Sequence, residues 1–239
     1  GSGARGQEFK KITYLELGKY ETMDQISAAK YLGNQSYIDA ERIGIFGWSY
    51  GGYMSSLCLF KGADVFKSAI AVAPVTNWKW YDTIYTERYM RTEKENESGY
   101  KDNSPVNFTD LMKGKYLLVH GVADDNVHFQ NTAEMVNALI RSNKQFDTYF
   151  YPNRNHGIFG GKTRLHLYNK MVHINDYNKG VENKHKFFVI PHHSLSLKPF
   201  RFKNCNTTLK IKIQYKSNLV KSSIICKYIE MLDAKELIL

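Results

Sequence analysis

The chain has 239 residues, 43% of them hydrophobic and 23% charged, which are ordinary proportions for a globular protein with one sizeable core. Its formal net charge of +10 lies mostly near the end, because residues 172–239 hold 12 of the 33 Lys and Arg residues but only 5 of the 23 Asp and Glu residues. The rest of the chain is nearly balanced, so the positive charge does not indicate a nucleic-acid partner. No targeting signal or membrane-spanning apolar run is visible, and the scattered cysteines predict neither a disulfide framework nor a metal site; we expect no cofactor.

Residues 1–171 alternate between helical and strand patterns, which is typical of an α/β sheet. In chain order we expect a helix over 22–33 capped by Thr22 and Gln25, a strand over 42–48, a helix over 53–60, strands over 68–73 and 116–120, a helix over 131–140 and a strand over 148–151. The run over 42–48 is short, apolar and followed by glycines, which suits a buried parallel strand. The helix over 131–140 is expected to bury Ala133, Val136, Leu139 and Ile140 on one face.

Residues 172–239 differ in composition from the rest of the chain. They contain one glycine and one alanine, are rich in Lys, Asn, Ile, Phe and His, and include a potential strand over 208–215 but no motif. We interpret them as an atypical basic tail. A frameshifted reading of AT-rich DNA, which encodes this kind of bias, or a disordered segment is favoured over an authentic extra domain. We therefore expect the tail not to dock on the core.

The run from Gly47 to Gly52 carries the first chemical signal. Gly47, Ser49 and Gly51 match G-x-S-x-G, the pattern of a nucleophile elbow, in which a strand turns into a helix within a few residues. Bulky side chains at positions 47 and 51 would collide with neighbouring backbone, and the turn would hold Ser49 in a strained conformation with its hydroxyl exposed. The N–H of Tyr50, at the start of the helix, could then stabilise an oxyanion. The alternative interpretation is an ordinary turn with a surface serine.

Two later loops supply candidates for the acid and the base of a catalytic triad. On folds that carry an elbow, the triad follows the order Ser, Asp or Glu, His, with each residue after a different strand. Asp124 and Asp125 follow the third expected strand, and His156 follows the fourth. Either aspartate could hold the imidazole in the tautomer that accepts the Ser49 proton. His120, at a strand end, is interpreted as a structural histidine.

Four runs of the sequence are similar to a known family. They are 1–9 (GSGARGQEF), 47–53 (GWSYGGY), 71–90 (AVAPVTNWKWYDTIYTERYM) and 120–130 (HGVADDNVHFQ), and they closely resemble the dipeptidyl peptidase IV branch of the prolyl oligopeptidase family. The resemblance covers about residues 1–171, and the spacings of 75 residues from Ser49 to Asp124 and 32 from Asp124 to His156 agree with it. It implies a C-terminal catalytic-domain fragment with a partial α/β-hydrolase fold whose N-terminal strands are missing.

The resemblance implies a serine peptidase, without metal or cofactor, that releases N-terminal dipeptides with Pro or Ala in the second position. It implies that Asp124 is the acid and that Asn126 binds a substrate carbonyl. It implies that Tyr81 and Tyr85 surround the ligand and that Val75, Trp78, Tyr85 and Val127 shape a small S1 pocket. Aromatic walls suit proline, a flat ring without an N–H, although without the resemblance the same side chains would be interpreted as core.

The resemblance also implies parts that this chain lacks. In the family a propeller and the first hydrolase strands come earlier; they supply glutamates for the substrate amine and a tyrosine as second oxyanion donor. We therefore expect one edge of the strand over 42–48 to be unpaired and the isolated chain to hydrolyse Gly-Pro substrates poorly. By resemblance, the full-length protein is a homodimer and is periplasmic, secreted or membrane-anchored. The alternatives are an inactive fragment, or an acylaminoacyl peptidase or carboxylesterase with the same triad.

Overall fold

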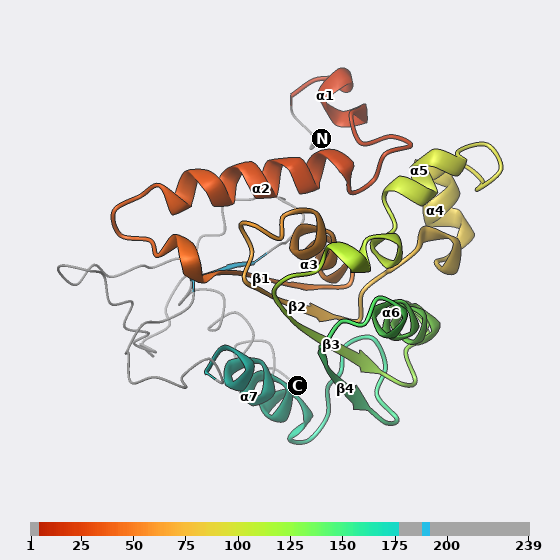
Figure 1. Cartoon of the computed structure of the whole chain (residues 1–239). Helices are drawn as coiled ribbons and strands as arrows, with labels where there is room; N and C mark the ends of the chain where they lie inside the picture. Colours follow the sequence, from red (N-terminus) through yellow and green to blue (C-terminus); the bar gives the residue numbers. More distant parts are fainter. Residues whose placement is uncertain (1–4, 177–187, 192–239) are drawn as a thin grey trace, which may run out of the picture.

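The computed structural model describes residues 5–176 and 188–191 (Figure 1). Its helices and strands are, in chain order, α1 (Gln7–Lys11), α2 (Lys19–Gly33), β1 (Ile43–Trp48), α3 (Tyr50–Lys61), β2 (Ser68–Val72), α4 (Thr83–Met90), α5 (Glu97–Asp102), β3 (Lys115–Gly121), α6 (Gln130–Arg141), β4 (Asp147–Tyr151), α7 (Thr163–Asp176) and β5 (Phe188–Pro191). Short 3-10 turns lie at Ala40–Arg42, Trp78–Trp80, Pro105–Asn107 and Thr109–Leu111. The alternation of strands and helices confirms the predicted α/β class.

The strands form one parallel five-stranded sheet in the order β4-β3-β2-β1-β5. β1 pairs with β2 from Gly44 opposite Ser68 to Trp48 opposite Val72. β2 pairs with β3, and β3 pairs with β4, through similar continuous registers. Because parallel strands all end at the same edge of a sheet, the loops that follow β1, β3 and β4 open at one common edge.

Alternate side chains of β1, β2 and β3 enter two separate cores on opposite faces of the sheet. In β3, Tyr116 and Leu118 belong to the larger core, whereas Leu117 and Val119 belong to the smaller one. All four side chains are buried. A sheet that is covered on both faces needs strands that are apolar on both sides, which explains why these strands read as continuous apolar runs.

Helices cover both faces of the sheet (Figure 1). α3 packs on β1 and β2 and is buried from Gly51 to Phe60. α6 adds Met135 and Leu139 to the same core, whereas α7 covers the other face through Leu167 and Met171. None of the helices in the described ranges is long and apolar enough to cross a membrane.

The starts of α2 and α3 differ from the prediction. α2 begins at Lys19, and Gly18 before it has a φ of 92° and donates its N–H to Glu21 Oε2 at 3.0 Å. Thr22 is buried inside the helix and is not its cap. α3 begins at Tyr50, three residues earlier than predicted, because the helix follows the elbow directly.

The buried face of α6 also differs from the prediction. Ala133 and Ile140 were expected inside, and this is wrong, because both are exposed. The helix instead buries a face that begins with Asn131 and Thr132 and continues through Met135. The two polar side chains are tolerated inside because each has a hydrogen-bond partner there.

The edge of β1 that faces away from β2 is paired, contrary to the prediction. β5 lies parallel to β1, with Ile43 opposite Phe188 and Phe46 opposite Pro191. At least these four residues of the tail therefore join the sheet, and α7 crosses the expected boundary at residue 171 without a break. The remainder of the tail, including the possible strand over 208–215, lies outside the described residues, so the division of the chain at residue 171 stays a prediction.

Candidate active site

The turn between β1 and α3 consists of a single residue, Ser49. Its φ of 58° and ψ of −119° lie outside the φ/ψ regions that residues with a side chain favour. This is the strained backbone predicted for an elbow. A Cβ at Gly47 would lie 2.0 Å from the carbonyl oxygen of Gly51, and one at Gly52 would lie 2.9 Å from Val72 O. The predicted crowding at position 47 is confirmed, and glycine is the residue that lets the strand turn so sharply.

The carboxylate of Asp124 and the imidazole of His156, the predicted acid and base, are in direct contact. Asp124 follows β3, His156 follows β4, and Asp124 Oδ2 lies 2.8 Å from His156 Nδ1. Asp124 Oδ1 accepts the N–H groups of Asn126 at 3.0 Å and Val127 at 2.9 Å. The neighbouring Asp125 is exposed, so the structure pairs the first aspartate with the histidine.

The environment of Asp124 favours its charged form. Burial by itself raises the pKa of this carboxyl, since its side chain has no exposed surface. The polar contacts from His120 and His156, together with the Asn126 N–H, outweigh burial and hold the pKa well below the usual range of an aspartate. An ionised carboxylate only accepts hydrogen bonds, so His156 Nδ1 carries a hydrogen and Nε2 is the nitrogen left to accept a proton.

Trp48 connects the elbow to the loop that carries the base. Its indole Nε1 donates a hydrogen bond to the main-chain oxygen of His156 at 3.0 Å. The residue before Ser49 therefore holds the backbone of His156. Within residues 5–176 the hydrogen bonds of His156 run to Asp124 and Trp48, so a direct bond between Ser49 Oγ and His156 Nε2 stays a prediction. Such contacts are often loose in a site without substrate.

An aromatic cluster follows β2, at the same edge of the sheet. Trp78 is buried and stacks on Tyr85 with a centroid distance of 5.7 Å and an interplanar angle of 24°. Tyr81 meets Trp78 edge-on at 5.9 Å and Tyr85 at 5.4 Å. Burial, helped by the neighbouring Tyr89 and Tyr81, raises the pKa of Tyr85 to about 12. Trp78 is thus a core residue, as the simpler interpretation held, while Tyr81 and Tyr85 remain partly exposed above it.

Three further residues were predicted to bind substrate: Asn126 through a peptide carbonyl, and Val75 and Val127 in the pocket. Asn126 is exposed and its side-chain oxygen accepts the Tyr81 hydroxyl at 2.8 Å, so the acid loop and the aromatic cluster are directly joined. Val75 and Val127 are buried and belong to the same core as Trp78. The structure therefore joins Asn126 to Tyr81 and buries Val75, Trp78 and Val127 in one core, and their contact with a substrate stays a prediction.

Sequence reasoning missed three contributions to this site. The side chain of Tyr50 joins the aromatic cluster at 5.6 Å from Trp78, and its hydroxyl donates to Glu21 Oε1 at 2.7 Å. Trp48 and His120 contact the base and the acid respectively. Of these, only His120 carried a local signal, since it lies four residues before Asp124 at the end of a buried strand.

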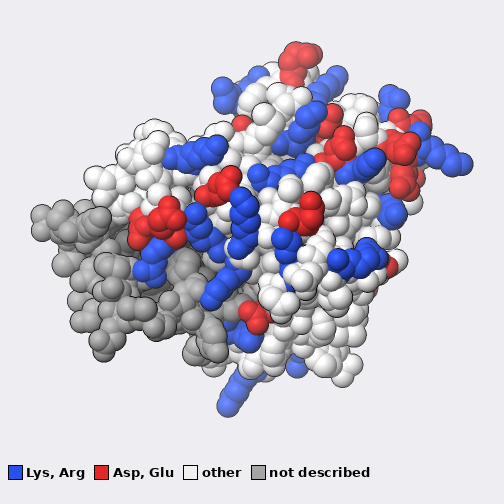
Figure 2. Space-filling view, viewed as in Figure 1, with Lys and Arg blue, Asp and Glu red and all other residues white. Residues whose placement is uncertain are grey.

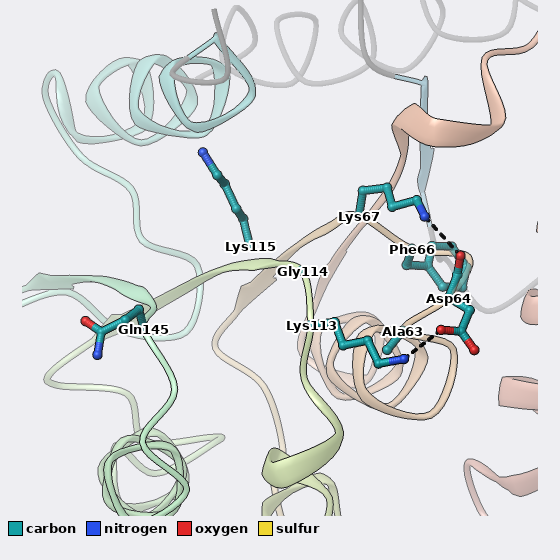
Figure 3. A pocket seen from close by; sticks show the side chains of 8 residues that line it. All are labelled: Ala63, Asp64, Phe66, Lys67, Lys113, Gly114, Lys115 and Gln145. Carbon is teal, nitrogen blue, oxygen red and sulfur yellow. Dashed lines mark hydrogen bonds and ion pairs between the residues drawn. The ribbon is translucent and has the colours of Figure 1, made fainter. Parts of the chain in front are cut away.

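A separate hollow of about 500 Å³ lies at the amino ends of β2 and β3 (Figure 3). Lys67, Lys113 and Lys115 line it, and Lys113 Nζ lies 2.8 Å from Asp64 Oδ1. Ligands of parallel α/β sheets bind at the carboxyl ends of the strands, where the triad candidates lie, so we place the candidate active site there and not in this hollow.

Acidic and basic side chains intermingle on the face shown in Figure 2. Within the described residues no cluster of His, Cys, Asp and Glu side chains could hold a metal ion.

Comparison with known proteins agrees with this geometry. The prolyl oligopeptidase family model matches residues 1–177. The chain is 44% identical over 177 residues to the prolyl endopeptidase FAP of Mus musculus, a match that covers 73% of this chain and 23% of that protein. It is 46% identical over 180 residues to a probable dipeptidyl-aminopeptidase B of Trichophyton verrucosum, covering 74% of this chain and 20% of that protein. Its structure is similar to the crystal structure of Porphyromonas gingivalis dipeptidyl peptidase 4, with 51% identity and a TM-score of 0.70 over 72% of this chain and 24% of that one.

The chain therefore spans about a quarter or less of the length of these relatives. The predicted partial α/β-hydrolase fold is confirmed by the similarity to the solved structure. The family match runs over Ser49, Asp124 and His156 alike, and the relatives named above fall in the predicted branch. The chain thus belongs to the prolyl oligopeptidase family, in its dipeptidyl peptidase IV branch.

Proposed function

We propose that Ser49, Asp124 and His156 form the catalytic triad of a serine peptidase. The observation that carries the proposal is the 2.8 Å contact between the buried Asp124 carboxylate and His156 Nδ1, beside a serine held at a φ of 58°. The order of the three residues along the chain is that of elbow-containing hydrolases. The His156 side chain is 22% exposed, so its ring can contact a substrate, whereas the Asp124 side chain behind it is shielded from solvent.

In the proposed reaction, His156 Nε2 takes the proton of the Ser49 hydroxyl as Oγ attacks the substrate carbonyl carbon. A C–O bond forms, and the carbonyl oxygen becomes an oxyanion near the N–H of Tyr50, at the positive end of α3. His156 then gives its proton to the leaving amine as the C–N bond breaks. Water attacks the resulting acyl-enzyme in the same way, which restores the serine. The Asp124 carboxylate stabilises the imidazolium that forms in both steps.

The proposed substrates are peptides with Pro or Ala in the second position from a free N-terminus. Tyr81 and Tyr85 are partly exposed above the buried Trp78, and such aromatic surfaces fit a proline ring by shape. Asn126, tied to Tyr81 and next to the acid, is placed to hold a peptide carbonyl through its side-chain N–H groups. By family resemblance we further propose that the full-length protein is a homodimer and acts in the periplasm, at the cell surface or outside the cell.

A fluorophosphonate probe tests whether the triad is assembled in this chain, because only an activated serine reacts with it. We expect labelling of the chain at Ser49, loss of labelling in Ser49→Ala, and little change in Asp125→Asn, which alters an exposed carboxylate next to the acid. Absence of labelling in the folded chain would identify it as an inactive fragment.

A comparison of three substrates tests the specificity. They are Gly-Pro-p-nitroanilide with a free amine, the same compound with a blocked amine, and a short acyl ester. We expect slow, Ser49-dependent release of p-nitroaniline from the free-amine substrate and less from the blocked one. Preference for the blocked substrate would instead indicate an endopeptidase or acylaminoacyl peptidase, and turnover of the ester alone would indicate a carboxylesterase.

A further inference from the structure

His120 lies at the end of β3, fully buried between the proposed acid and helix α6. Its Nε2 is 2.8 Å from the main-chain oxygen of Val127 and 3.2 Å from Asp124 Oδ2. Its Nδ1 is 2.7 Å from Thr132 Oγ1, which is itself buried. Both ring nitrogens are therefore occupied by neighbours inside the protein.

These neighbours determine which nitrogen carries the hydrogen. Val127 O and the ionised Asp124 Oδ2 are both acceptors, so Nε2 must carry a hydrogen, directed chiefly at the closer Val127 O. The Thr132 hydroxyl, which can donate or accept, pairs with Nδ1, and no buried polar group of this trio is left without a partner. Both ring nitrogens are engaged by buried neighbours, so neither is free to accept a proton from the serine.

His120 and the acid are joined through the same short turn. The N–H of Val127 donates to Asp124 Oδ1 at 2.9 Å, while the carbonyl of Val127 accepts from His120. The His120 Nε2–H thus contacts Val127, the last residue of the turn, and the carboxylate of Asp124, its first residue. One oxygen of Asp124 is held by the turn itself, and the other lies against two imidazoles, of which only His156 reaches the surface.

We infer that His120 is a positioning residue of the active site: it fixes the turn over 124–127 and the Asp124 carboxylate in the orientation that receives His156. The inference rests on the proposed triad and assigns His120 no contact with substrate. Loss of the hydrogen-bond partner that orients a metal-bound histidine or carboxylate costs about 10–100-fold in activity. We expect an effect of that order here, less than the ~10⁴-fold that loss of the acid's own role costs.

Two amide substitutions of His120 distinguish a role in positioning the Asp124 carboxylate from a role in packing alone. In His120→Gln the side-chain nitrogen can reach the place of Nε2 and keep a donor toward Val127 O and Asp124. In His120→Asn the amide reaches only the place of Nδ1, near Thr132, and this donor is lost. His128→Asn, at an exposed histidine, is the matched control.

Two measurements on the full chain test the inference: the rate of fluorophosphonate labelling of Ser49, and the low-field proton resonance of His156 Nδ1–H, which is bound to a carboxylate. We expect His120→Asn to slow labelling about 10–100-fold and to shift or broaden the resonance. His120→Gln should keep the resonance and most of the rate, and His128→Asn should keep both.

Equal losses in the Gln and Asn variants, or a wild-type rate and resonance in His120→Asn, would overturn the inference. Denaturant unfolding of both variants shows whether a loss merely follows stability. If the wild-type chain is not labelled at all, the proposed function fails, but the resonance still reports whether His120 holds the acid. The two ideas can therefore fail separately.

Discussion

Replacing Gly47 by alanine should distort the elbow, because the added methyl group would overlap main-chain atoms of Gly51. The new Cβ would lie 2.0 Å from the Gly51 oxygen and 2.1 Å from its carbonyl carbon, against 3.4 Å or more in ordinary contacts. Both atoms belong to backbone in the first turn of α3, so no side chain can rotate away. Either the end of β1 or the start of α3 must move by more than ~1 Å, a shift that well-packed protein interiors resist.

Neither element can move cheaply. Gly47 pairs with Ala71 in the β1–β2 ladder, and the Ser49 N–H donates to Val72 O at 2.8 Å. α3 is buried along nearly its whole length. Overpacking of this kind costs about 1–3 kcal/mol or more, a large part of the ~5–15 kcal/mol that usually stabilises a domain. A displacement of the nucleophile by ~1 Å should in addition slow its reaction about 10²-fold.

Denaturant unfolding and fluorophosphonate labelling measure the two effects separately. The matched control is Gly33→Ala, where the added Cβ would meet Ala40 and Ile43 at 3.4 Å, within ordinary contact. This variant should unfold at a denaturant concentration equal to or slightly above that of the wild type, and its Ser49 should react with the fluorophosphonate at the wild-type rate. If Gly47→Ala unfolds at the same denaturant concentration as Gly33→Ala and labels at the wild-type rate, the elbow tolerates a side chain and the steric reasoning is refuted.

Three further predictions concern the acid and its surroundings. In the full-length protein, Asp124→Asn should lower kcat nearly as far as ~10⁴-fold by favouring the wrong His156 tautomer, whereas Asp125→Asn should be mild; equal losses would show that the acid is misassigned. Trp48→Phe removes the bond to His156 O, so the free energy of unfolding should fall by about 1 kcal/mol or more and Ser49 labelling should slow; an unchanged unfolding curve would contradict this. Because the folded pKa of Asp124 lies below the unfolded value of about 3.9, its stabilising effect is complete above that pH and is lost as pH falls through the folded pKa. Wild type should therefore lose more stability than Asp124→Asn between about pH 4 and pH 2, and parallel acid-unfolding curves would argue against it.

The elbow and the acid–base pair could be predicted from sequence because their constraints are local. A strand that must turn within one residue needs glycine where backbone approaches backbone, so the Gly47–Ser49 pattern reports a geometry directly. Parallel strands end at one edge, so residues that follow different strands meet there regardless of loop detail. The choice between Asp124 and Asp125 was not local, and it depended on the family resemblance until the structure paired one of them with His156.

The supporting contacts could not be read in the same way. The bond from Trp48 to His156 O joins residues 108 positions apart, and nothing in either local sequence marks it. The buried face of α6 was misread because apolar residues alone were counted. Asn131 and Thr132 lie inside because hydrogen bonds to distant segments satisfy them, and such partners cannot be inferred from helical periodicity.

The pairing of β5 with β1 shows a related limit. The composition of residues 172–239 suggested a segment unrelated to the core, yet Phe188–Pro191 lies in register with β1. Strand pairing uses main-chain N–H and C=O groups, which every residue supplies except that proline lacks the N–H. A short apolar segment can therefore complete a sheet edge even where overall composition gives no sign of it.

The contacts that hold His156 have a consequence for a variant in which residue 156 has no imidazole ring. Trp48 binds the main-chain oxygen of residue 156, and Arg164 Nη2 binds that of Gly157 at 3.3 Å, so neither contact needs the imidazole. Asp124 is likewise fixed by main-chain N–H groups. In His156→Ala the Asp124 carboxylate should remain in place beside a cavity with the dimensions of an imidazole. Free imidazole added to that variant should enter the cavity as a ligand, orient on Asp124 and restore part of the reactivity of Ser49.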